Sequence, residues 1–224
     1  MIEGPHHSED LGVVFDMDGV LLDSTACHGQ AFLEVLKPLG IVDFLYARFA
    51  GWRTPDVFRT VFQEAGLPMD QEKIADCSKR KSARARELLE ERNVFRLNTP
   101  VVAKLAGHYP LALASSGSRS SVETFLQKSG LHSAFRSVVT GDDVNLAKPH
   151  PEIFLRAMAE LRMPPARCVV VEDAAAGIQA ACASGAIACA FGRDSEGLLA
   201  RAGARYRIES LSELPALLES LRLA

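Results

Sequence analysis

The sequence has no long apolar run and no surplus of basic charge. No stretch approaches the ~20 consecutive apolar residues of a membrane-spanning helix. The 25 basic residues are outnumbered by 28 acidic ones, which leaves a formal net charge of −3. Nucleic-acid binding that depends on net charge needs a basic surplus or a basic stripe. We therefore expect neither nucleic acid nor a membrane as a partner.

Cysteine is scarce and carries no metal-binding pattern. The five cysteines are Cys27, Cys77, Cys168, Cys182 and Cys189. They form no C-x-x-C pair and no spacing typical of zinc, and most have apolar neighbours, which is typical of buried thiols in a reducing compartment. The first ten residues are polar and do not resemble a secretory signal. These features predict a cytoplasmic protein.

Short apolar runs that alternate with helical patterns fill most of the chain. The runs that indicate strands are 13–15, 111–114, 138–139, 169–171 and 187–191. The helical patterns between them are 99–105, 120–130, 151–158 and 174–184. Apolar strands separated by helices predict an α/β fold, in which a parallel sheet is covered on both faces.

The stretch from about residue 26 to 98 breaks this alternation. It contains no convincing strand, and its helical patterns are 31–36, 54–62 and 70–92. Unstructured connections of this length are rare in compact domains. We therefore predict a helical domain at 26–98, inserted into a catalytic domain that consists of residues 1–25 and 99–224.

Two carboxylates follow the first predicted strand, in Asp16-Met17-Asp18-Gly19. Ligands gather at the carboxyl ends of strands in open α/β sheets, and alternate residues of an extended segment share a face. Asp16 and Asp18 are thus placed to act on one ligand, as a nucleophile with a proton donor or as a hard-cation site. Gly19 permits a close backbone approach or a positive φ. Taken alone, the pattern is equally typical of a turn with solvated acids.

Three further polar signals follow later in the chain. Ser115-Ser116-Gly117 is typical of a helix N-cap or of an anion site. Lys148 alone suits a surface charge, and Glu172-Asp173 alone suits the dipole of the helix that follows. Four such signals at one edge of one sheet are improbable as coincidence. Together they predict phosphoryl transfer, in which an aspartate attacks phosphorus while a metal, a hydroxyl and an ammonium hold the phosphate.

The chain resembles the haloacid dehalogenase superfamily, and within it the β-phosphoglucomutase-like phosphatases that carry a helical cap. The segments that carry the resemblance are FDMDGVLLDS at 15–24, ALASSG at 112–117, KPHPEIF at 148–154 and VEDAAAGIQAA at 171–181. The resemblance covers essentially the whole chain after the first ten residues. It implies a Rossmann-like parallel-sheet core with an inserted α-helical cap, which closes over the substrate and excludes bulk water.

The resemblance also implies the catalytic and metal-binding residues. Asp16 is the expected nucleophile, which becomes an aspartyl phosphate, and Asp18 is the expected general acid and then base. The expected magnesium ligands are Asp16, the backbone carbonyl of Asp18, Glu172 and Asp173. Mg²⁺ suits this site because its ligands are oxygens that it shares with phosphate.

The phosphate-binding positions of the family are matched by Ser115 and Lys148. We expect Ser116 to bind phosphate beside Ser115, since hydroxyls and free amides meet at the start of a helix there. Gly117, in the same loop, is expected to contact the substrate.

Further substrate contacts are expected from the cap and from the helix after Gly117. His28 and Lys81 match residues near the acid/base in the mutase branch, although a helix histidine and a solvated helix face are equally simple interpretations. Arg53 lies in a loop that resembles the family's specificity loop and suits a carboxylate or a second phosphate. The mutase arginine falls one position later, where this chain has Thr54. Arg119 stands at a position that contacts sugars in the mutases.

Asp18 decides between reaction types, because dehalogenases and the phosphonate-cleaving branch of the superfamily lack an acid at this position. The sequence therefore predicts a Mg²⁺-dependent phosphatase for a small phosphorylated metabolite, such as a sugar phosphate. A monomer is the default expectation, because the sequence does not indicate the oligomeric state. A sugar phosphomutase stays open as the alternative. A signalling receiver domain also combines a phospho-accepting aspartate with a later serine and lysine. It would carry an acidic pair before the phospho-accepting strand and no large insert, so it fits less well.

Overall fold

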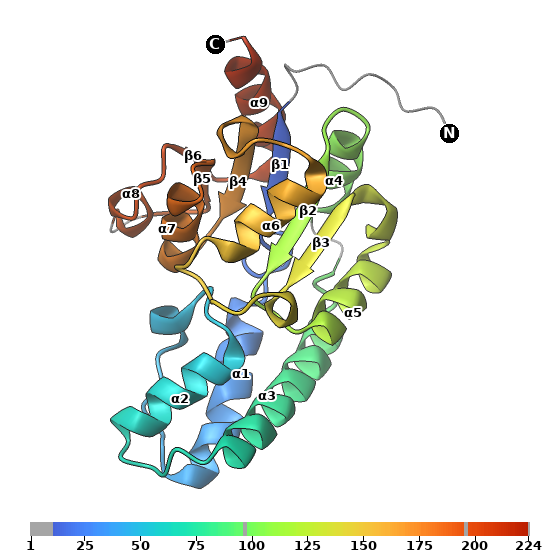
Figure 1. Ribbon diagram of the computed structural model, residues 1–224. Coiled ribbons are helices and arrows are strands. Elements are labelled where there is room, and N and C mark those ends of the chain that lie inside the picture. Colours follow the sequence, from blue (N-terminus) through green and yellow to red (C-terminus); the bar gives the residue numbers. More distant parts are fainter. Residues whose placement is uncertain (1–10, 96–97, 195–196, 224) are drawn as a thin grey trace.

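A single parallel sheet of six strands organises the protein (Figure 1). The computed structural model describes residues 11–95, 98–194 and 197–223. The strands are β1 Gly12–Phe15, β2 Leu111–Ser115, β3 Ser137–Thr140, β4 Cys168–Glu172, β5 Ile187–Phe191 and β6 Tyr206–Ile208. Their order is β3-β2-β1-β4-β5-β6, and all five pairings are parallel. The predicted α/β fold is confirmed, and each of the five predicted strands belongs to this sheet.

Helices cover both faces of the sheet, as its buried and largely apolar strands require. They are α4 Thr99–Ala106, α5 Arg119–Ser129, α6 Glu152–Leu161, α7 Ala175–Ala183, α8 Leu198–Arg201 and α9 Leu214–Arg222. In β1, Val13 and Phe15 belong to a buried cluster with residues of α4, α5 and α9, whereas Val14 packs with residues of α6 and α7. Since both faces are buried, polar side chains gather where the central strands end.

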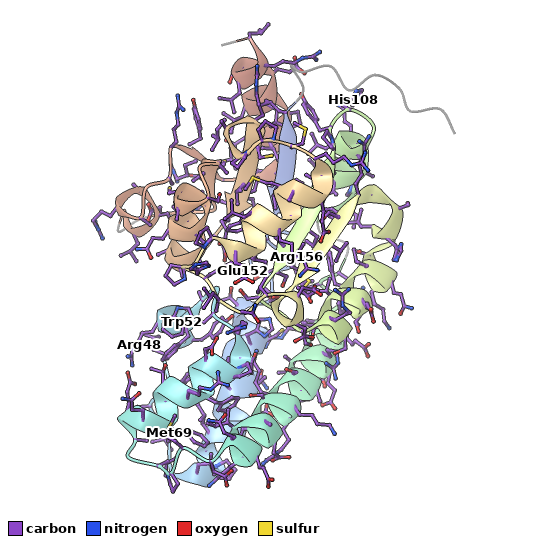
Figure 2. All side chains as sticks on the ribbon, viewed as in Figure 1. Arg48, Trp52, Met69, His108, Glu152 and Arg156 are labelled. Atoms are coloured by element: carbon purple, nitrogen blue, oxygen red, sulfur yellow. The ribbon has the colours of Figure 1, made fainter. Side chains whose placement is uncertain are left out.

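Three more helices lie between β1 and α4, in the lower part of Figure 1: α1 Thr25–Leu36, α2 Thr54–Glu64 and α3 Gln71–Arg92. They form their own apolar cluster, which includes Phe32, Phe58 and Phe62. Trp52 lies at the end of this helical segment nearest the sheet (Figure 2), and its ring meets Phe49 edge-on. The described residues of 26–98 contain no strand, as the sequence predicts. The domain boundaries themselves stay a prediction.

Short elements complete the fold, and some of them were not predicted from the sequence. The 3₁₀ turns are Lys37–Leu39, Tyr46–Phe49, His132–Ala134, Gly141–Asp143, Pro165–Arg167 and Leu211–Glu213. β6 and α8 have three and four residues, which is too few to show a periodic pattern, and the sequence also missed α9. None of the helices in the described ranges is both long and apolar enough to cross a membrane. The interpretation of residues 1–10 concerns a segment outside the described ranges.

Candidate active site

The carboxyl ends of β1, β2 and β4 bring the predicted catalytic residues together. The Nζ atom of Lys148 lies 2.6 Å from Oδ1 of Asp16 and 2.6 Å from Oε1 of Glu172. The side chains of Lys148 and Glu172 are completely buried, and that of Asp16 is 6 % exposed. One buried ammonium therefore bridges the end of β1 to the end of β4.

Negative charge exceeds positive charge among these buried groups. Burial lowers the pKa of Lys148, but Asp16 and Glu172 outweigh it and hold that pKa above its usual range. Burial, opposed by Lys148 and reinforced by Glu172, raises the pKa of Asp16 to about 8. Burial and the neighbouring carboxylates also raise the pKa of Asp173 well above its usual range. A further cation at this site would relieve the repulsion.

Three of these carboxylates are arranged as metal ligands. One oxygen from each of Asp16, Glu172 and Asp173 lies within 4.8 Å of the other two. All donors are oxygens, which fits Mg²⁺. Glu172 is already engaged on both oxygens, because Oε1 accepts from Lys148 and Oε2 accepts from the backbone N–H of Ala174 at 2.8 Å. Asp16 and Asp173 therefore have the more available oxygens.

Two glycines make room for the acidic side chains. Gly19 has φ +82°, and a Cβ there would lie 1.8 Å from Oδ2 of Asp173. A Cβ on Gly177 in α7 would lie 1.8 Å from Oε1 of Glu172. The positive φ and the close approach that the sequence predicts for Gly19 are both present. The equivalent requirement at Gly177 became visible only in the structure.

The loop after β2 presents the predicted phosphate-binding groups. Ser115 is 1 % exposed, and its Oγ accepts a hydrogen bond of 3.0 Å from the backbone N–H of Gly117. Within the described residues its hydroxyl donates no hydrogen bond, so that hydrogen is free for a ligand. The hydroxyl of Ser116 instead donates to the carbonyl of Gly51 at 2.7 Å. A phosphate contact by Ser116 stays a prediction for its backbone N–H.

The structure brings His28 and Lys81 to Asp18, the predicted acid/base. The Nε2 atom of His28 lies 2.8 Å from Oδ1 of Asp18, and its Nδ1 atom lies 2.8 Å from Nζ of Lys81. One neutral tautomer satisfies both contacts: Nε2–H donates to the carboxylate, while Nδ1 accepts from the ammonium. Lys81 is only 4 % exposed and lies 4.3 Å from the centre of the Phe32 ring.

The pKa values of Asp18, His28 and Lys81 follow from their burial and from the charges of their neighbours. Burial raises the pKa of Asp18, but His28 outweighs it and lowers that pKa to about 2. Burial and Lys81 lower the pKa of His28, although Asp18 opposes the change. Burial lowers the pKa of Lys81 to about 8, although Asp18 opposes the change. Asp18 is thus a carboxylate in this structure.

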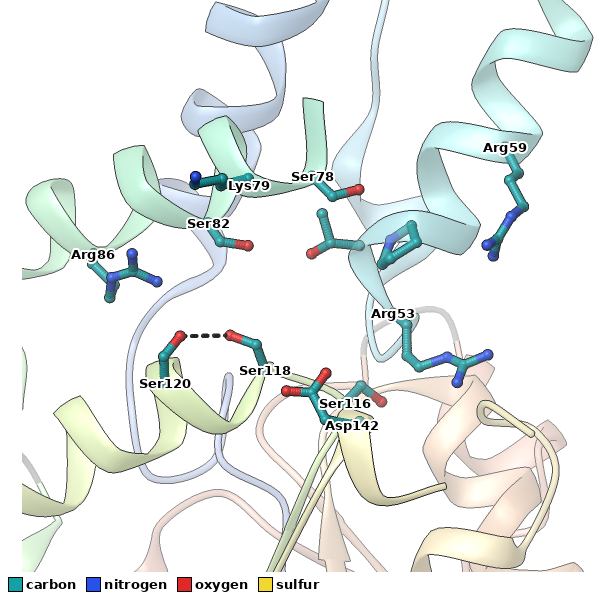
Figure 3. Close-up of a pocket in the computed structure, with 13 residues that line it drawn as sticks. Arg53, Arg59, Ser78, Lys79, Ser82, Arg86, Ser116, Ser118, Ser120 and Asp142 are labelled. Atoms are coloured by element: carbon teal, nitrogen blue, oxygen red, sulfur yellow. Dashed lines mark hydrogen bonds between the residues drawn. The ribbon is translucent and has the colours of Figure 1, made fainter. Parts of the chain in front are cut away.

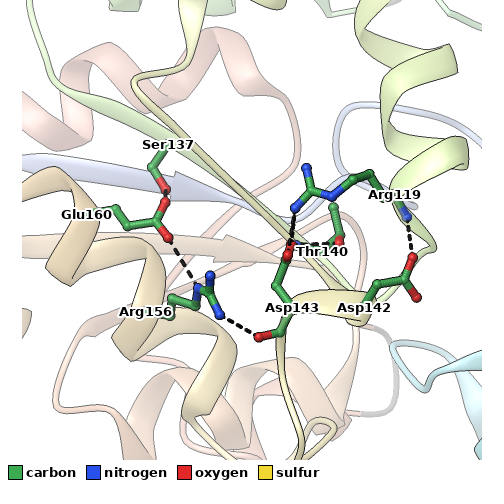
Figure 4. Close-up of polar contacts among 7 residues, drawn as sticks. All are labelled: Arg119, Ser137, Thr140, Asp142, Asp143, Arg156 and Glu160. Atoms are coloured by element: carbon green, nitrogen blue, oxygen red, sulfur yellow. Dashed lines mark hydrogen bonds and ion pairs between the residues drawn. The ribbon is translucent and has the colours of Figure 1, made fainter.

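The two predicted arginines bind partners within the protein. The Nε atom of Arg53 donates to Asp56 at 2.8 Å, and its Nη1 donates to the carbonyl of Val144 at 3.1 Å. Arg119 pairs with Asp143 through Nη2, as Figure 4 shows. These contacts join Arg53 to the sheet domain and Arg119 to the loop after β3. Substrate binding by either guanidinium stays a prediction.

The structure adds candidate residues that sequence reasoning missed. A cavity of about 530 Å³ lies between the helical segment and the loops after β2 and β3 (Figure 3), and Ser82 and Arg86 of α3 line it. Tyr46 approaches the acidic cluster: burial and then the charge of Asp18, followed by those of the other carboxylates, raise its pKa well above the usual range. The sequence singled out Lys81 on α3 but gave no sign that Ser82 and Arg86 on the same helix line a cavity.

Comparisons with known proteins agree with this geometry. Residues 13–191 match the family model described as haloacid dehalogenase-like hydrolase. The chain is 32% identical to fructose-1-phosphate phosphatase YqaB of Escherichia coli, over 78% of this chain and 92% of that protein. It is 30% identical to a phosphorylated carbohydrates phosphatase of Thermotoga maritima, over 77% and 81%. A crystal structure of β-phosphoglucomutase from Clostridium difficile has a similar fold, with a TM-score of 0.81 at 19% identity, covering 96% of this chain and 100% of that one.

Proposed function

The chain belongs to the haloacid dehalogenase-like hydrolases, and we propose that it is a Mg²⁺-dependent phosphatase of a small phosphorylated metabolite. The substrate would be a sugar phosphate or a related phosphomonoester, as the names of the two phosphatase relatives suggest. One observation carries the proposal: two carboxylates of the same loop, Asp16 and Asp18, contact different basic side chains. Asp16 contacts the buried Lys148, whereas Asp18 contacts His28.

The proposed reaction uses Asp16 as the nucleophile. Its carboxylate oxygen bonds to phosphorus, the ester P–O bond breaks, and the leaving oxygen takes a proton from Asp18. Asp18 then takes a proton from water, the water oxygen attacks phosphorus, and inorganic phosphate leaves Asp16. Asp18 must hold a proton for the first step. The dianionic phosphate of the substrate would raise its proton affinity, because like charges disfavour the ionised carboxyl.

The remaining polar groups would hold the phosphate and the metal. Lys148 and the free hydroxyl hydrogen of Ser115 are suited to two phosphate oxygens. Asp16, Asp173, the carbonyl of Asp18 and Glu172 would hold Mg²⁺. When bound, Mg²⁺ would neutralise charge on the phosphate and so favour attack by an anion. The contact of Ser116 with Gly51 supports the proposed exclusion of water, because it holds the helical segment against the catalytic loops.

A panel of phosphorylated sugars tests this function against the phosphomutase alternative. With Mg²⁺ present, the protein should release inorganic phosphate from at least one sugar phosphate and should form no positional isomer of it. Rapid isomerisation without phosphate release would overturn the phosphatase proposal in favour of a mutase. The mutase alternative is supported by the placement of His28 and Lys81 beside Asp18, and Thr54 in place of the mutase arginine speaks against it.

A further inference from the structure

Two adjoining cavities lie between the helical segment and the sheet domain. The smaller one, about 40 Å³, is lined by Asp18, His28 and Lys81. The larger one is about 530 Å³, within the usual range of small-molecule pockets. The two share part of their lining: Thr54, Ser82, Arg86 and Ser118. A substrate whose ester oxygen lies at Asp18 therefore has its other end directed into the larger cavity.

The lining of the larger cavity is basic. It includes four cationic side chains and one carboxylate: Arg53, Arg59, Lys79, Arg86 and Asp142. Arg53 and Arg59 share one carboxylate, that of Asp56, which accepts from Arg53 at 2.8 Å and from Arg59 at 2.6 Å and so offsets one of their two charges. Asp142 accepts from the backbone N–H of Arg119 at 2.8 Å.

Lys79 and Arg86 are the cations of this lining that have no acidic partner among the described residues. Within the described residues neither side chain has a hydrogen bond or an ion pair. They are two helical turns apart on α3, so they share a face, and Ser82 lies between them on the same wall of the cavity. In Figure 3 the guanidinium of Arg86 lies across the cavity from Ser118 and Ser120. Arg86 is half-buried and Lys79 is exposed, so Arg86 is the inner of the two groups.

We propose that Arg86, with Lys79 at the rim, binds a second anionic group of the substrate, a phosphate or a carboxylate at the end remote from the transferred phosphate. The inference rests on the proposed function and narrows its substrate class to metabolites with two anionic groups. It also assigns their recognition to α3, because Arg53 in the expected specificity loop is already bound to Asp56 and Val144. A guanidinium is suited to two-point binding of either anion.

Matched pairs of substrates test the assignment by kinetics. Three-, five- and six-carbon sugar monophosphates are compared with the same sugars that carry a second phosphate, or a carboxylate, at the far carbon. For at least one pair, wild type should prefer the two-anion compound. Arg86→Gln should raise its KM about tenfold or more, with little change in kcat or in the values for the monophosphate. Lys79→Gln should have a smaller effect of the same kind, and Arg86→Lys an intermediate one.

Arg80→Gln is the matched control on the same helix. Arg80 is exposed, lies outside both cavity linings and forms only a 3.7 Å ion pair with Asp76. This variant should leave all the kinetic constants unchanged. Equal losses on one-anion and two-anion substrates in Arg86→Gln, or no preference of wild type in any pair, would overturn the assignment.

Calorimetric binding separates this inference from the phosphatase proposal. The same pairs are titrated into wild type and Arg86→Gln without Mg²⁺, with equal melting temperatures required of both proteins. The subsite would be supported if wild type bound a two-anion compound more tightly than its one-anion partner and Arg86→Gln lost this difference, even if no phosphate were ever released. Equal affinities within every pair would overturn the subsite, even if phosphatase activity were found.

Discussion

The hydroxyl of Ser116 donates a 2.7 Å hydrogen bond to the backbone carbonyl of Gly51, across 65 residues of sequence. The bond joins the loop after β2 to the loop before α2. Gly51 also lies close to the start of α7, because a Cβ on Gly51 would be 3.2 Å from the Cβ of Ala174, the residue that precedes this helix. This contact therefore holds the helical segment against the loops that carry the catalytic groups.

Ser116→Ala should loosen that contact. The net value of one neutral hydrogen bond is about 0.5–1.5 kcal/mol, so we expect kcat/KM to fall about 2- to 10-fold. Hydrogen exchange at Phe49 to Arg53 should become faster. Ser220→Ala removes a bond of the same length to Leu217 in α9 and should change neither value. Unchanged exchange in Ser116→Ala would contradict the role given to this bond.

Gly19→Ala should disrupt the acidic cluster. The added Cβ would overlap Asp173, and φ at this position is +82°. We expect a loss of phosphate release of about 100-fold or more, as for other misplaced catalytic groups. Gly40→Ala is the control, because Gly40 has φ +83° with nothing within 4 Å of the added Cβ. It carries the same backbone strain without the overlap, so its activity should stay near that of wild type.

Asp16→Asn should abolish turnover and leave the fold intact. The amide cannot act as the nucleophile, and we expect phosphate release to fall by about 10³ or more. Asp23→Asn, an exposed aspartate later in the same segment, should retain activity. Circular dichroism and melting temperature should match those of wild type. Retained activity in Asp16→Asn would refute this nucleophile.

The buried Lys81 should make stability depend on alkaline pH. Burial lowers its folded-state pKa from 10.5 to about 8, so between these values the unfolded chain binds the proton and the folded chain does not. The contribution of this group to the unfolding free energy therefore rises with pH, by about 2 kcal/mol between pH 8 and 10. Urea unfolding measures the free energy of unfolding of wild type and of Lys81→Met at both pH values. From the lower to the higher pH, the free energy of wild type relative to that of the variant should rise by this amount. A constant difference would contradict the low pKa.

Removal of divalent metal should abolish activity, and Mg²⁺ should restore it. Mg²⁺ should also raise the melting temperature, because it binds the folded state and relieves repulsion around Asp16 and Asp173. The rise should be about 2–4 °C for each kcal/mol of binding free energy in a chain of this size. Asp173→Asn should lose most of that rise. Equal rises in wild type and Asp173→Asn would place the ion elsewhere.

The sheet and the catalytic centre were predictable because local patterns define them. Short apolar runs identify the strands, and Asp16, Ser115 and Glu172 stand at or directly after the ends of such runs. Parallel pairing then brings those ends together. The distances confirm that the residues meet, while their chemical roles stay predictions.

The long-range partners of several side chains were not predictable from local patterns. Arg53, Ser116 and Arg119 each bind a group from a distant part of the chain, respectively Val144, Gly51 and Asp143. Such pairings depend on the folded arrangement. Arg86 was missed for a related reason: it lies beside the buried stripe of α3, which includes Ile74, Ala85 and Leu88, and only the folded arrangement shows that this flank lines a cavity.

The hydrogen bond between His28 and Asp18 crosses from the helical segment to the β1 loop, and it couples mechanical position to proton affinity. A displacement of α1 would take the imidazole away from the carboxylate and admit water in its place. Burial, which raises the pKa of Asp18, and His28, which lowers it, would then weaken together. Because the effect of His28 exceeds that of burial in this arrangement, such a displacement would return the pKa of Asp18 toward its ordinary value, so the position of α1 regulates the proton affinity of Asp18.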